Sequence, residues 1–336
     1  MELITTDEFL QIGETMPLLD VRSPSEFNQG HIPGAINLPL LNDEERALVG
    51  TCYKQKGNLA AVILGYKLVG ERFAGYLELA IEMFPSKKIV IHCWRGGLRS
   101  RIMSQIFENG GFTVFVLKGG YKNYRNWVMK TLETEKKIFV LGGLTGSGKT
   151  DLLKLLGEKQ EQVIDLEALA SHKGSALGDL GQPQQPTQEN FENLLASQWI
   201  KIDAKKTLWL EDESRMIGRL VLPSGVYNQI RNSRLFEIEI PNEMRIQRLR
   251  IEYGEFEKEK LIEKTKKIRK RLGDLRTRQA IELIEEGKMS EWVELLLQYY
   301  DKTYRYGQSL RPQLLKKLIK IPSPQAVELF LRDVYS

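Results

Sequence analysis

Short apolar runs alternate with longer segments of helical spacing along the first third of the chain. Four of the runs predict strands, because each is short, apolar and bounded by Gly, Pro or polar turn residues. These runs lie at 16–22, 35–38, 87–93 and 113–120. Helical spacing is present at 59–84 and 99–111. The alternation predicts a mostly parallel sheet covered on both faces, and we place this α/β domain at residues 1–130.

The same alternation continues after a predicted connecting helix at 121–135. The runs that predict four more strands lie at 136–143, 162–167, 207–212 and 234–241. After Pro241 the pattern becomes helical and basic. The elements expected there are an aromatic-rich helix around 292–304, a short strand near 318–321 and a last helix at 323–335. We divide this part into an α/β domain at 131–255 and a helical extension of that domain at 256–336.

The bulk composition excludes several classes of protein. The 336 residues are 42% hydrophobic and 28% charged, which is ordinary for folded domains and unlike disordered chains. No apolar run approaches the length of a membrane span. The first residues lack the basic stretch and apolar core of a signal peptide. We therefore expect no membrane partner. Two cysteines are too few for a disulfide framework, so we also expect a cytoplasmic protein in which a thiol is available for chemistry.

The net charge of +5 is concentrated in one segment of the chain. Residues 245–278 contain thirteen Lys or Arg and six Asp or Glu, so the rest of the chain is slightly acidic. A basic segment of this kind favours a polyanionic partner, with nucleic acid first. The alternative is a solvated helix face with charge pairs four residues apart.

The stretch HCWRGGLRS at 92–100 surrounds a cysteine with glycines and cations. A strand, a loop and a helix in this order place Cys93 at the carboxyl end of a parallel strand, where loop N–H groups and the helix N-terminus converge. The two glycines allow the positive φ that such a loop needs, and the two arginines add cations. We therefore expect a lowered pKa for the Cys93 thiol and an anion cradle at its sulfur, rather than a cysteine that merely packs as a small hydrophobic residue. The predicted catalytic residues are Cys93, Arg95 and Arg99, and the predicted cradle residues are Gly96, Gly97 and Ser100.

The stretch GLTGSGKT at 143–150 matches the phosphate-binding pattern G-x-x-x-x-G-K-[ST] in full. It follows a predicted strand and opens a predicted helix, which is the context that this pattern requires. Its backbone N–H groups would surround a diphosphate, Lys149 would supply a positive charge, and Thr150 could ligate Mg²⁺ if a metal takes part. The predicted phosphate-binding residues are Gly143, Thr145, Gly146, Ser147, Gly148, Lys149 and Thr150.

Acidic residues follow two predicted strands of the second domain. TLWLEDES places Glu211, Asp212 and Glu213 at a strand end, where ligands of parallel sheets bind, and the sequence does not choose among the three. A solvated strand end is the alternative. QVIDLE ends a second strand at the same edge, and the polar turn SHKGSALG follows it. The candidate substrate-contacting or acid–base residues are Asp165, Glu167, His172, Ser175, Glu211 and Glu213.

The stretch DVRSPSEFNQGHIPGAINLP, followed by a strand-borne cysteine and an arginine-bearing loop, resembles a rhodanese domain. In that family the cysteine carries sulfur as a persulfide. The resemblance implies mainly structural roles for Asp20, Arg22, Glu26, His31 and Gly34. HCWRGGLRS also fits H-C-x5-R-[ST], the pattern of cysteine phosphatases, some of which have a rhodanese fold. The loop of ordinary sulfurtransferases is one residue shorter, and the longer loop here suits a tetrahedral anion such as phosphate. A rhodanese-fold phosphatase fused to a P-loop kinase-like domain is therefore the alternative function.

The cysteine loop and the phosphate loop together resemble the tRNA 2-selenouridine synthase family over nearly the whole chain. Further matching stretches are DVRSPSEF, GHIPGAINLP, HKGS at 172–175, QPQQPTQENFE at 182–192 and EDESRMIG at 211–218. The resemblance implies an α/β protein with an N-terminal rhodanese-like domain, a nucleotide-kinase-like P-loop domain with a parallel sheet, and a basic helical C-terminal extension. It also implies a tRNA-modifying transferase without a tightly bound cofactor.

The implied reaction acts on 2-thiouridine at the wobble position of tRNA in two steps. A geranyl group from geranyl diphosphate first alkylates the sulfur, and selenium from selenophosphate then replaces the S-geranyl group. The phosphate loop is the natural site for the diphosphate, and the Cys93 cradle suits selenophosphate, with Cys93 carrying selenium.

The tRNA would contact the basic segment at 245–278. We expect the phosphates of the tRNA to contact Lys266, Lys267, Arg269, Lys270 and Arg271. Tyr299, Tyr300 and Tyr304 either stack a flipped base or pack in the helical core. Two further alternatives are a P-loop kinase with an inert rhodanese module, in which Cys93 is dispensable, and a non-catalytic RNA-binding module, in which Lys149 is dispensable as well.

Overall fold

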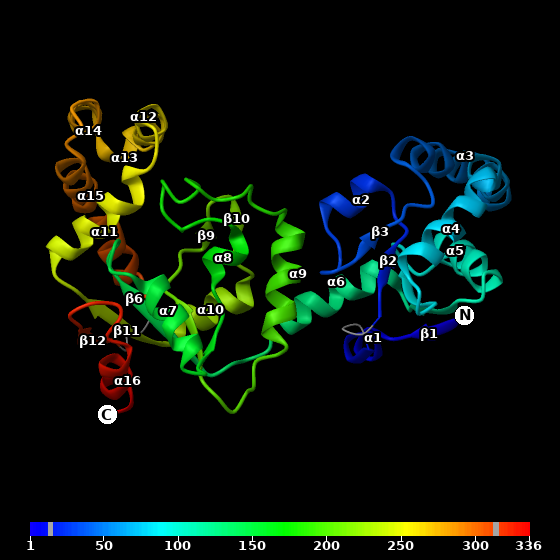
Figure 1. The fold of residues 1–336 in the computed structure, drawn as a ribbon, viewed down its shortest axis with the longest axis horizontal. Helices are drawn as coiled ribbons and strands as arrows, with labels where there is room; N and C mark the ends of the chain where they lie inside the picture. The colour runs from blue at the N-terminus through cyan, green and yellow to red at the C-terminus, as the bar shows by residue number, and fades with distance from the viewer. Residues whose placement is uncertain (13–15, 312–315) are drawn as a thin grey trace. The chain divides into compact units, whose positions relative to one another are not determined.

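The chain forms two compact units (Figure 1). The computed structural model describes residues 1–12, 16–311 and 316–336. The first unit contains Met1–Thr131 and Thr187–Ser197, and the second contains Leu132–Pro186 and Gln198–Ser336. Residues 187–197 therefore lie in sequence between the two segments of the second unit but pack as part of the first.

The first unit is built on a five-stranded sheet in which every pairing is parallel. The strand order is β1-β5-β4-β2-β3. The strands are β1 (Glu2–Ile4), β2 (Leu18–Asp20), β3 (Ile36–Asn37), β4 (Lys88–His92) and β5 (Thr113–Leu117). The apolar pattern predicted all of them except β1, a three-residue edge strand that pairs with β5 alone.

Helices surround this sheet and supply the rest of its core. They are α1 (Thr6–Ile12), α2 (Pro24–Gln29), α3 (Asp43–Val69), α4 (Phe73–Met83), α5 (Leu98–Asn109), α6 (Gly120–Thr131) and most of α9 (Gln188–Trp199), with a single 3-10 turn at Gly70–Arg72. In the core, Ala80 of α4 and Phe107 of α5 pack with Leu19 and Ile91 of the sheet, and all four are fully buried. The apolar spacing of α4 and α5 thus places the β4–α5 connection at the carboxyl end of a buried strand.

A buried polar cluster lies under the same edge of this sheet. Asp20 and Arg22 are each 0% exposed, and Arg22 Nη2 donates to Asp20 Oδ2 at 2.6 Å and to Gly30 O at 2.7 Å. His92 Nε2 lies 3.7 Å from Asp20 Oδ2, and burial lowers the pKa of His92. The side chain of His31 stacks on Phe27 at a centroid distance of 4.0 Å. These contacts hold the loops together, in keeping with the structural roles expected for Asp20, Arg22 and His31.

The second unit is built on another five-stranded sheet in which every pairing is parallel. The strand order is β12-β11-β6-β8-β7. The strands are β6 (Ile138–Gly143), β7 (Gln162–Val163), β8 (Leu208–Glu211), β11 (Arg234–Glu239) and β12 (Lys316–Lys320). A short antiparallel hairpin, β9 (Met216–Ile217) and β10 (Leu220–Val221), follows β8.

The prediction of a strand over 162–167 is wrong in its second half. The strand ends at Val163, and α8 (Leu166–Ala170) begins three residues later. Asp165 is the N-cap of α8, because its Oδ1 accepts a hydrogen bond from Ala168 N at 2.8 Å. Glu167 consequently lies in the first turn of a helix and not at a strand end.

The remaining helices cover this sheet and extend it. They are α7 (Lys149–Glu158), α10 (Ser224–Asn232), α11 (Asn242–Gly254), α12 (Lys258–Lys267), α13 (Arg269–Leu272), α14 (Asp274–Glu285), α15 (Met289–Ser309) and α16 (Val327–Tyr335). Tyr253 of α11, Leu261 of α12 and Trp292 of α15 share one buried apolar cluster. The helical, basic C-terminal extension expected from the sequence is therefore present, and the α/β class with parallel sheets is confirmed.

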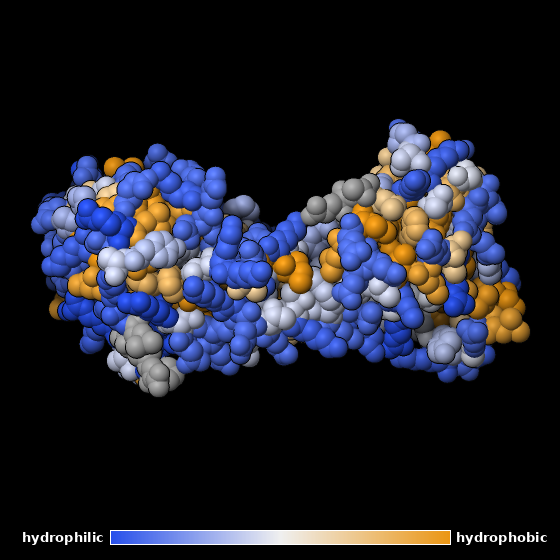
Figure 2. Space-filling model, turned by 90° about the horizontal axis from the view of Figure 1, so that it is seen from below, coloured by the Kyte–Doolittle hydropathy of each residue, from blue (hydrophilic) through white to orange (hydrophobic). Residues whose placement is uncertain are grey.

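Hydrophilic and apolar side chains share the surface of the molecule. The face shown in Figure 2 is mainly hydrophilic, with apolar side chains in separate patches, as on most folded proteins. Within the part of the chain that the structure describes, no helix has both the length and the apolar character needed to cross a membrane.

Candidate active sites

The cysteine loop connects β4 to α5. Trp94–Gly97 turn at the carboxyl end of β4, as the order of strand, loop and helix predicts. The turn before α6 packs against this loop. A Cβ atom on Gly120, which has φ of +57°, would lie 2.2 Å from Cys93 O and 2.6 Å from Gly96 N. Only glycine fits this position, so the two loops can close tightly around Cys93.

Cys93 is 3% exposed and lies between the core and the loop. One side of the residue packs with the apolar cluster of the sheet. On the other side, its Sγ accepts a hydrogen bond from Gly97 N at 3.3 Å and lies 3.4 Å from Ser100 Oγ. Ser100 Oγ donates to Gly97 O at 2.9 Å, which holds the hydroxyl beside the sulfur. The sulfur therefore faces polar groups and the positive end of α5 as well as apolar packing.

The two arginines of the loop have different surroundings. Arg99 Nη1 contacts Glu26 Oε2 at 2.5 Å. Burial raises the pKa of Glu26, but the hydrogen bond and charge of Arg99 outweigh it and leave the pKa below its ordinary value. Arg95 is exposed and makes no ion pair among the described residues. Of the two predicted cations, Arg99 is therefore already bound to a carboxylate, whereas Arg95 is exposed.

The expectation of positive φ at both glycines of the loop holds for only one of them. Gly96 has φ of +65°, whereas Gly97 has φ of −98° and directly precedes α5. The tight turn of this loop therefore falls at Gly96, one residue before the position that joins the loop to α5.

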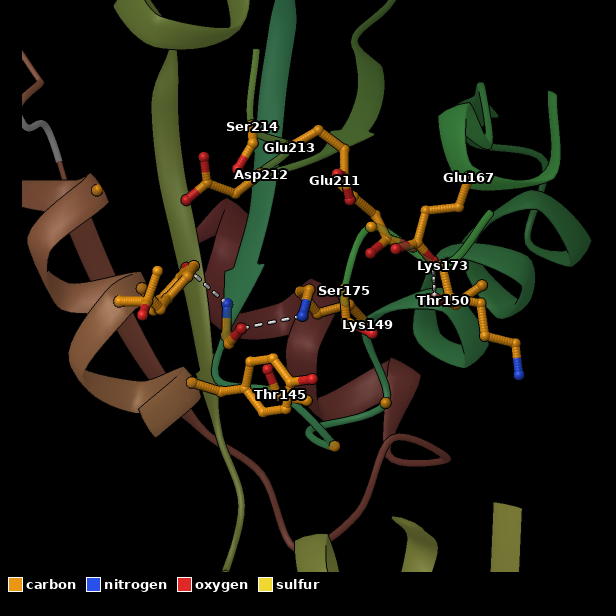
Figure 3. A pocket seen from close by; sticks show the side chains of 18 of the residues that line it. Thr145, Lys149, Thr150, Glu167, Lys173, Ser175, Glu211, Asp212, Glu213 and Ser214 are labelled. Carbon is orange, nitrogen blue, oxygen red and sulfur yellow. Dashed lines mark hydrogen bonds between the residues drawn. The ribbon is translucent and has the colours of Figure 1, made fainter. Parts of the chain in front are cut away.

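The phosphate loop connects β6 to α7, as its sequence predicts. Gly148 has φ of +78° directly before α7, a conformation that favours glycine. Lys149 Nζ donates to Gly143 O at 3.0 Å, and Gly143 N donates to Tyr304 Oη at 2.9 Å (Figure 3). Six of the seven predicted phosphate-binding residues line one cavity of about 700 Å³. The exception is Ser147, which is 1% exposed and lines a smaller cavity instead.

Three carboxylates face the phosphate loop, and we call them the acidic trio. Glu167 comes from α8, Glu211 from the end of β8, and Glu213 from the segment after β8. One oxygen of each lies within 4.8 Å of an oxygen of the other two. Thr150 Oγ1 donates to Glu167 Oε2 at 3.4 Å, which links the trio to the loop (Figure 3). The cavity therefore combines a phosphate loop with a dense group of acids.

Burial raises the pKa of every carboxyl in the acidic trio, and repulsion within the trio adds to the rise at Glu167 and Glu213. The pKa of Glu167 is raised to about 9 by burial and then by the charges of Glu213 and Glu211. The pKa of Glu213 is raised to about 8 by burial and then by Glu211. Burial also raises the pKa of Glu211, and Lys149 opposes the shift in all three. At neutral pH the trio therefore holds protons unless a cation compensates its charge.

The other predicted acids and polar residues have separate surroundings. Asp212, the residue after β8, also lines the cavity, but its side chain points away from the trio (Figure 3) and pairs with Arg311. Asp165, the cap of α8, is not among the residues that line the cavity, whereas Ser175 is. His172 is 8% exposed and its Nδ1 has no hydrogen-bond partner in the described residues; burial lowers its pKa.

Two helices supply further walls of the cavity: α10, which the sequence did not predict at this site, and α15, which carries two of the three tyrosines expected either to stack a base or to pack in the helical core. Tyr227 and Arg231 come from α10, and Tyr300 and Tyr304 from α15. Tyr300 also packs against the helical apolar cluster, as does Tyr299. Tyr227, Tyr300 and Tyr304 thus line the cavity on the side formed by these two helices. No local pattern connects them with the phosphate loop, because their spacing is that of ordinary amphipathic helices.

The five residues predicted to bind tRNA are exposed on α12 and α13. Lys267 pairs with Glu263 at 2.8 Å, and Arg269 pairs with Asp274 at 2.6 Å. The other three make no ion pair within the ranges that the structure describes. The segment therefore carries some charges that are paired on the helix surface and others that remain available to a polyanion.

The folds and loops together define a class of protein in which one chain joins a rhodanese-like domain bearing a cysteine loop to a P-loop domain bearing an acidic cavity. A family model for rhodanese-like domains matches residues 5–126. A family model for the AAA domain of tRNA 2-selenouridine synthase matches residues 136–332.

The chain belongs to the tRNA 2-selenouridine synthase family. It is 37% identical to a tRNA 2-selenouridine synthase of Shewanella denitrificans, over 93% of this chain and 94% of that protein. It is 38% identical to one of Hydrogenovibrio crunogenus, over 94% of each. Among solved structures, the N-terminal domain of a putative ATP/GTP binding protein from Clostridium difficile 630 is 35% identical and matches 38% of this chain and 98% of its own, with a TM-score of 0.36.

The raised pKa of Glu213 predicts that Glu213→Gln stabilises the protein at alkaline pH. Between the ordinary pKa and about 8, the folded state binds more protons than the unfolded state, so the free energy of unfolding falls as pH rises. Because glutamine cannot ionise, the free energy of unfolding of the variant should exceed that of the parent chain by about 1–3 kcal/mol at pH 8 and should equal it near pH 4. Urea unfolding at both pH values measures the gain. Glu255→Gln, at an exposed position, is the control, and equal gains at both pH values would contradict the prediction.

Proposed function

We propose that the protein modifies tRNA, converting 2-thiouridine at the wobble position to 2-selenouridine by geranylation and then selenium replacement. The chemistry supports two steps, because the sulfur of a thiocarbonyl leaves poorly and alkylation turns it into a thiol leaving group. The observation that carries the proposal is the pair of loops: a phosphate loop facing an acidic cavity in one unit, and a cysteine loop in the other. Membership in the tRNA 2-selenouridine synthase family supports the assignment of tRNA as substrate.

The phosphate loop is the proposed seat of geranyl diphosphate. The sulfur of the base attacks the first carbon of the geranyl group, the carbon–oxygen bond breaks, and pyrophosphate leaves while the base loses its N3 proton. Backbone N–H groups of the loop and Lys149 would stabilise the charge that develops on the leaving pyrophosphate. Tyr227, Tyr300 and Tyr304 line the same cavity, and we place the uncharged parts of the substrates beside them.

Thr150 and the acidic trio fit a divalent cation. All their donors are oxygens, which Mg²⁺ prefers. Glu211 Oε1 is buried and has no hydrogen-bond partner in the described residues, as expected for a ligand atom. A cation held there would neutralise charge on the departing pyrophosphate.

The cysteine loop is the proposed site of selenium delivery from selenophosphate. Selenium in selenophosphate is already at the selenide oxidation level, so binding it to the Cys93 sulfur would require an oxidant. No oxidant is needed if the Cys93 thiolate attacks phosphorus, the P–Se bond breaks and selenide leaves to add at C2 of the base. The geranyl thiol then departs, and water hydrolyses the phosphocysteine. The five-residue spacing between Cys93 and Arg99, which suits a tetrahedral anion, favours this route.

The same spacing supports the alternative function, a rhodanese-fold cysteine phosphatase fused to a P-loop kinase-like domain. Ser100 Oγ at 3.4 Å from Cys93 Sγ is the observation in its favour. This alternative predicts turnover of an aryl phosphate without any change in tRNA nucleosides, whereas the proposed function predicts nucleoside products that contain geranyl or selenium.

Two single substitutions should separate the two steps. Lys149→Ala should lose geranylation by at least about 100-fold, because a charge that stabilises the leaving group is removed. The same variant should still replace sulfur by selenium on tRNA that is already geranylated. Cys93→Ser should show the opposite pattern, because its nucleophile is removed. Mass spectrometry of tRNA nucleosides measures both steps, and the reverse pattern would overturn the assignment of substrates to loops.

Charge reversal on α12 and α13 tests the tRNA-binding segment. The triple variant Lys266→Glu, Lys270→Glu, Arg271→Glu should bind tRNA about tenfold more weakly or worse, and the affinity should depend less steeply on salt concentration. Lys54→Glu with Lys56→Glu, exposed on α3, is the matched control. Filter binding at several salt concentrations measures both effects. Unchanged affinity in the triple variant would show that the segment is only a solvated helix surface.

A further inference from the structure

Tyr121 connects the cysteine loop to the rest of the first unit. It is 0% exposed, at the start of α6. Its backbone N–H donates to Cys93 O at 2.9 Å, and the N–H of Lys122 donates to Trp94 O at 2.9 Å. Two successive residues of α6 thus fix the backbone of the cysteine and of the next residue. Any displacement of Tyr121 moves the base of the loop that carries the sulfur.

The ring of Tyr121 is held from one side by a buried cation. The Arg22 guanidinium lies 3.8 Å from the centre of the Tyr121 ring. The indole of Trp94, in the cysteine loop, packs beside it at a centroid distance of 5.8 Å. Because Asp20 and Gly30 O already fix Arg22, the guanidinium is a rigid platform for the ring.

The hydroxyl of Tyr121 is held from the other side by α9. Tyr121 Oη donates to Glu189 Oε2 at 2.9 Å and accepts from Asn193 Nδ2 at 3.0 Å. Asn193 is 0% exposed, and its Nδ2 also donates to His31 O at 2.7 Å. These two α9 residues lie within the stretch that matches the AAA-domain family model, yet their contacts are with the rhodanese-like unit.

The fit of α9 against this unit is close. A Cβ atom on Gly30 would lie 2.5 Å from Tyr121 Oη and 2.6 Å from Glu189 Cβ, so this position has room for glycine only. His31 N donates to Asn190 Oδ1 at 2.9 Å, one residue further along. Arg125 of α6 pairs with Glu192 of α9, and its Nη1 donates to Asn193 Oδ1 at 2.6 Å. Helix α9 is therefore held against this unit by several polar contacts and by close packing.

We propose that α9 completes the Cys93 site and that Tyr121 is the positioning residue through which it acts. Glu189 and Asn193 orient the Tyr121 hydroxyl, and Tyr121 in turn fixes the backbone of Cys93. A segment belonging in sequence to the P-loop domain thus sets the geometry of the cysteine loop. The role of this geometry in selenium delivery rests on the proposed function, whereas the dependence of Cys93 on α9 does not.

Two substitutions should remove hydrogen bonds between α9 and the Tyr121 hydroxyl without leaving a cavity in the apolar core. Tyr121→Phe keeps the ring on Arg22 and loses both hydrogen bonds to α9, and Glu189→Ala removes the acceptor. In each variant the kcat for selenium replacement on geranylated tRNA should fall about tenfold, the loss expected for one or two buried hydrogen bonds. The KM for tRNA and the rate of geranylation should stay as in the parent chain.

A spectroscopic measurement tests the link without any substrate. In a Cys52→Ser background Cys93 is the only cysteine, so ¹³Cβ-labelled cysteine gives a single NMR resonance for the site. Tyr121→Phe and Glu189→Ala should shift this resonance. Glu189→Gln keeps an acceptor of the same length and should restore both the resonance and kcat. Glu192→Gln weakens the contacts of residue 192 with Arg125 and Gln188 but keeps Glu189 and Asn193, which bond to the Tyr121 hydroxyl, so it is the matched control for the packing of α9.

Two results would overturn the proposal. One is a folded Tyr121→Phe variant with the parent resonance and the parent kcat. The other is an equal loss in Glu192→Gln, which would reduce α9 to a general structural support. If the parent chain shows no selenium replacement at all, the proposed function fails, and the resonance still decides whether α9 positions Cys93.

Discussion

Both candidate sites depend on one constraint, a buried parallel strand that ends in a glycine loop and passes directly into a helix. In the first unit this loop follows β4, and in the second it follows β6. The geometry directs backbone N–H groups and a helix N-terminus to one place, so an anion can be bound before any side chain contributes. The side chains then distinguish the loops: Cys93 is the proposed nucleophile of one, and Lys149 is the proposed fixed charge of the other.

The charges around each loop limit the anions that it can bind. At the cysteine loop, Glu26 pairs with Arg99 and offsets its charge. At the phosphate loop, the acidic trio surrounds Lys149 with carboxyls whose pKa values are raised by burial. An anion in this cavity is therefore disfavoured unless the carboxyls are protonated or a cation compensates their charge.

The sequence predicted what depends on local pattern. The two glycine loops, the parallel sheets and the helical extension all follow from short motifs and apolar spacing. Contacts between distant segments could not be predicted, because no pattern within α9 shows that Asn193 would bond to Tyr121, seventy-two residues earlier. The same holds for Tyr304 at the phosphate loop. Asp165 and Glu167 were placed on a strand because an apolar run resembles a strand, although an aspartate before a helix is also a good cap.

The central claim is that the two loops serve successive steps on one nucleotide. The most direct measurement is to incubate the purified chain with thiolated tRNA, geranyl diphosphate and selenophosphate, omit each small substrate in turn, and identify the nucleosides by mass. The account predicts 2-selenouridine only with both substrates, and S-geranyl-2-thiouridine when selenophosphate is omitted. Selenium incorporation without geranyl diphosphate, or unchanged tRNA with both present, would contradict it.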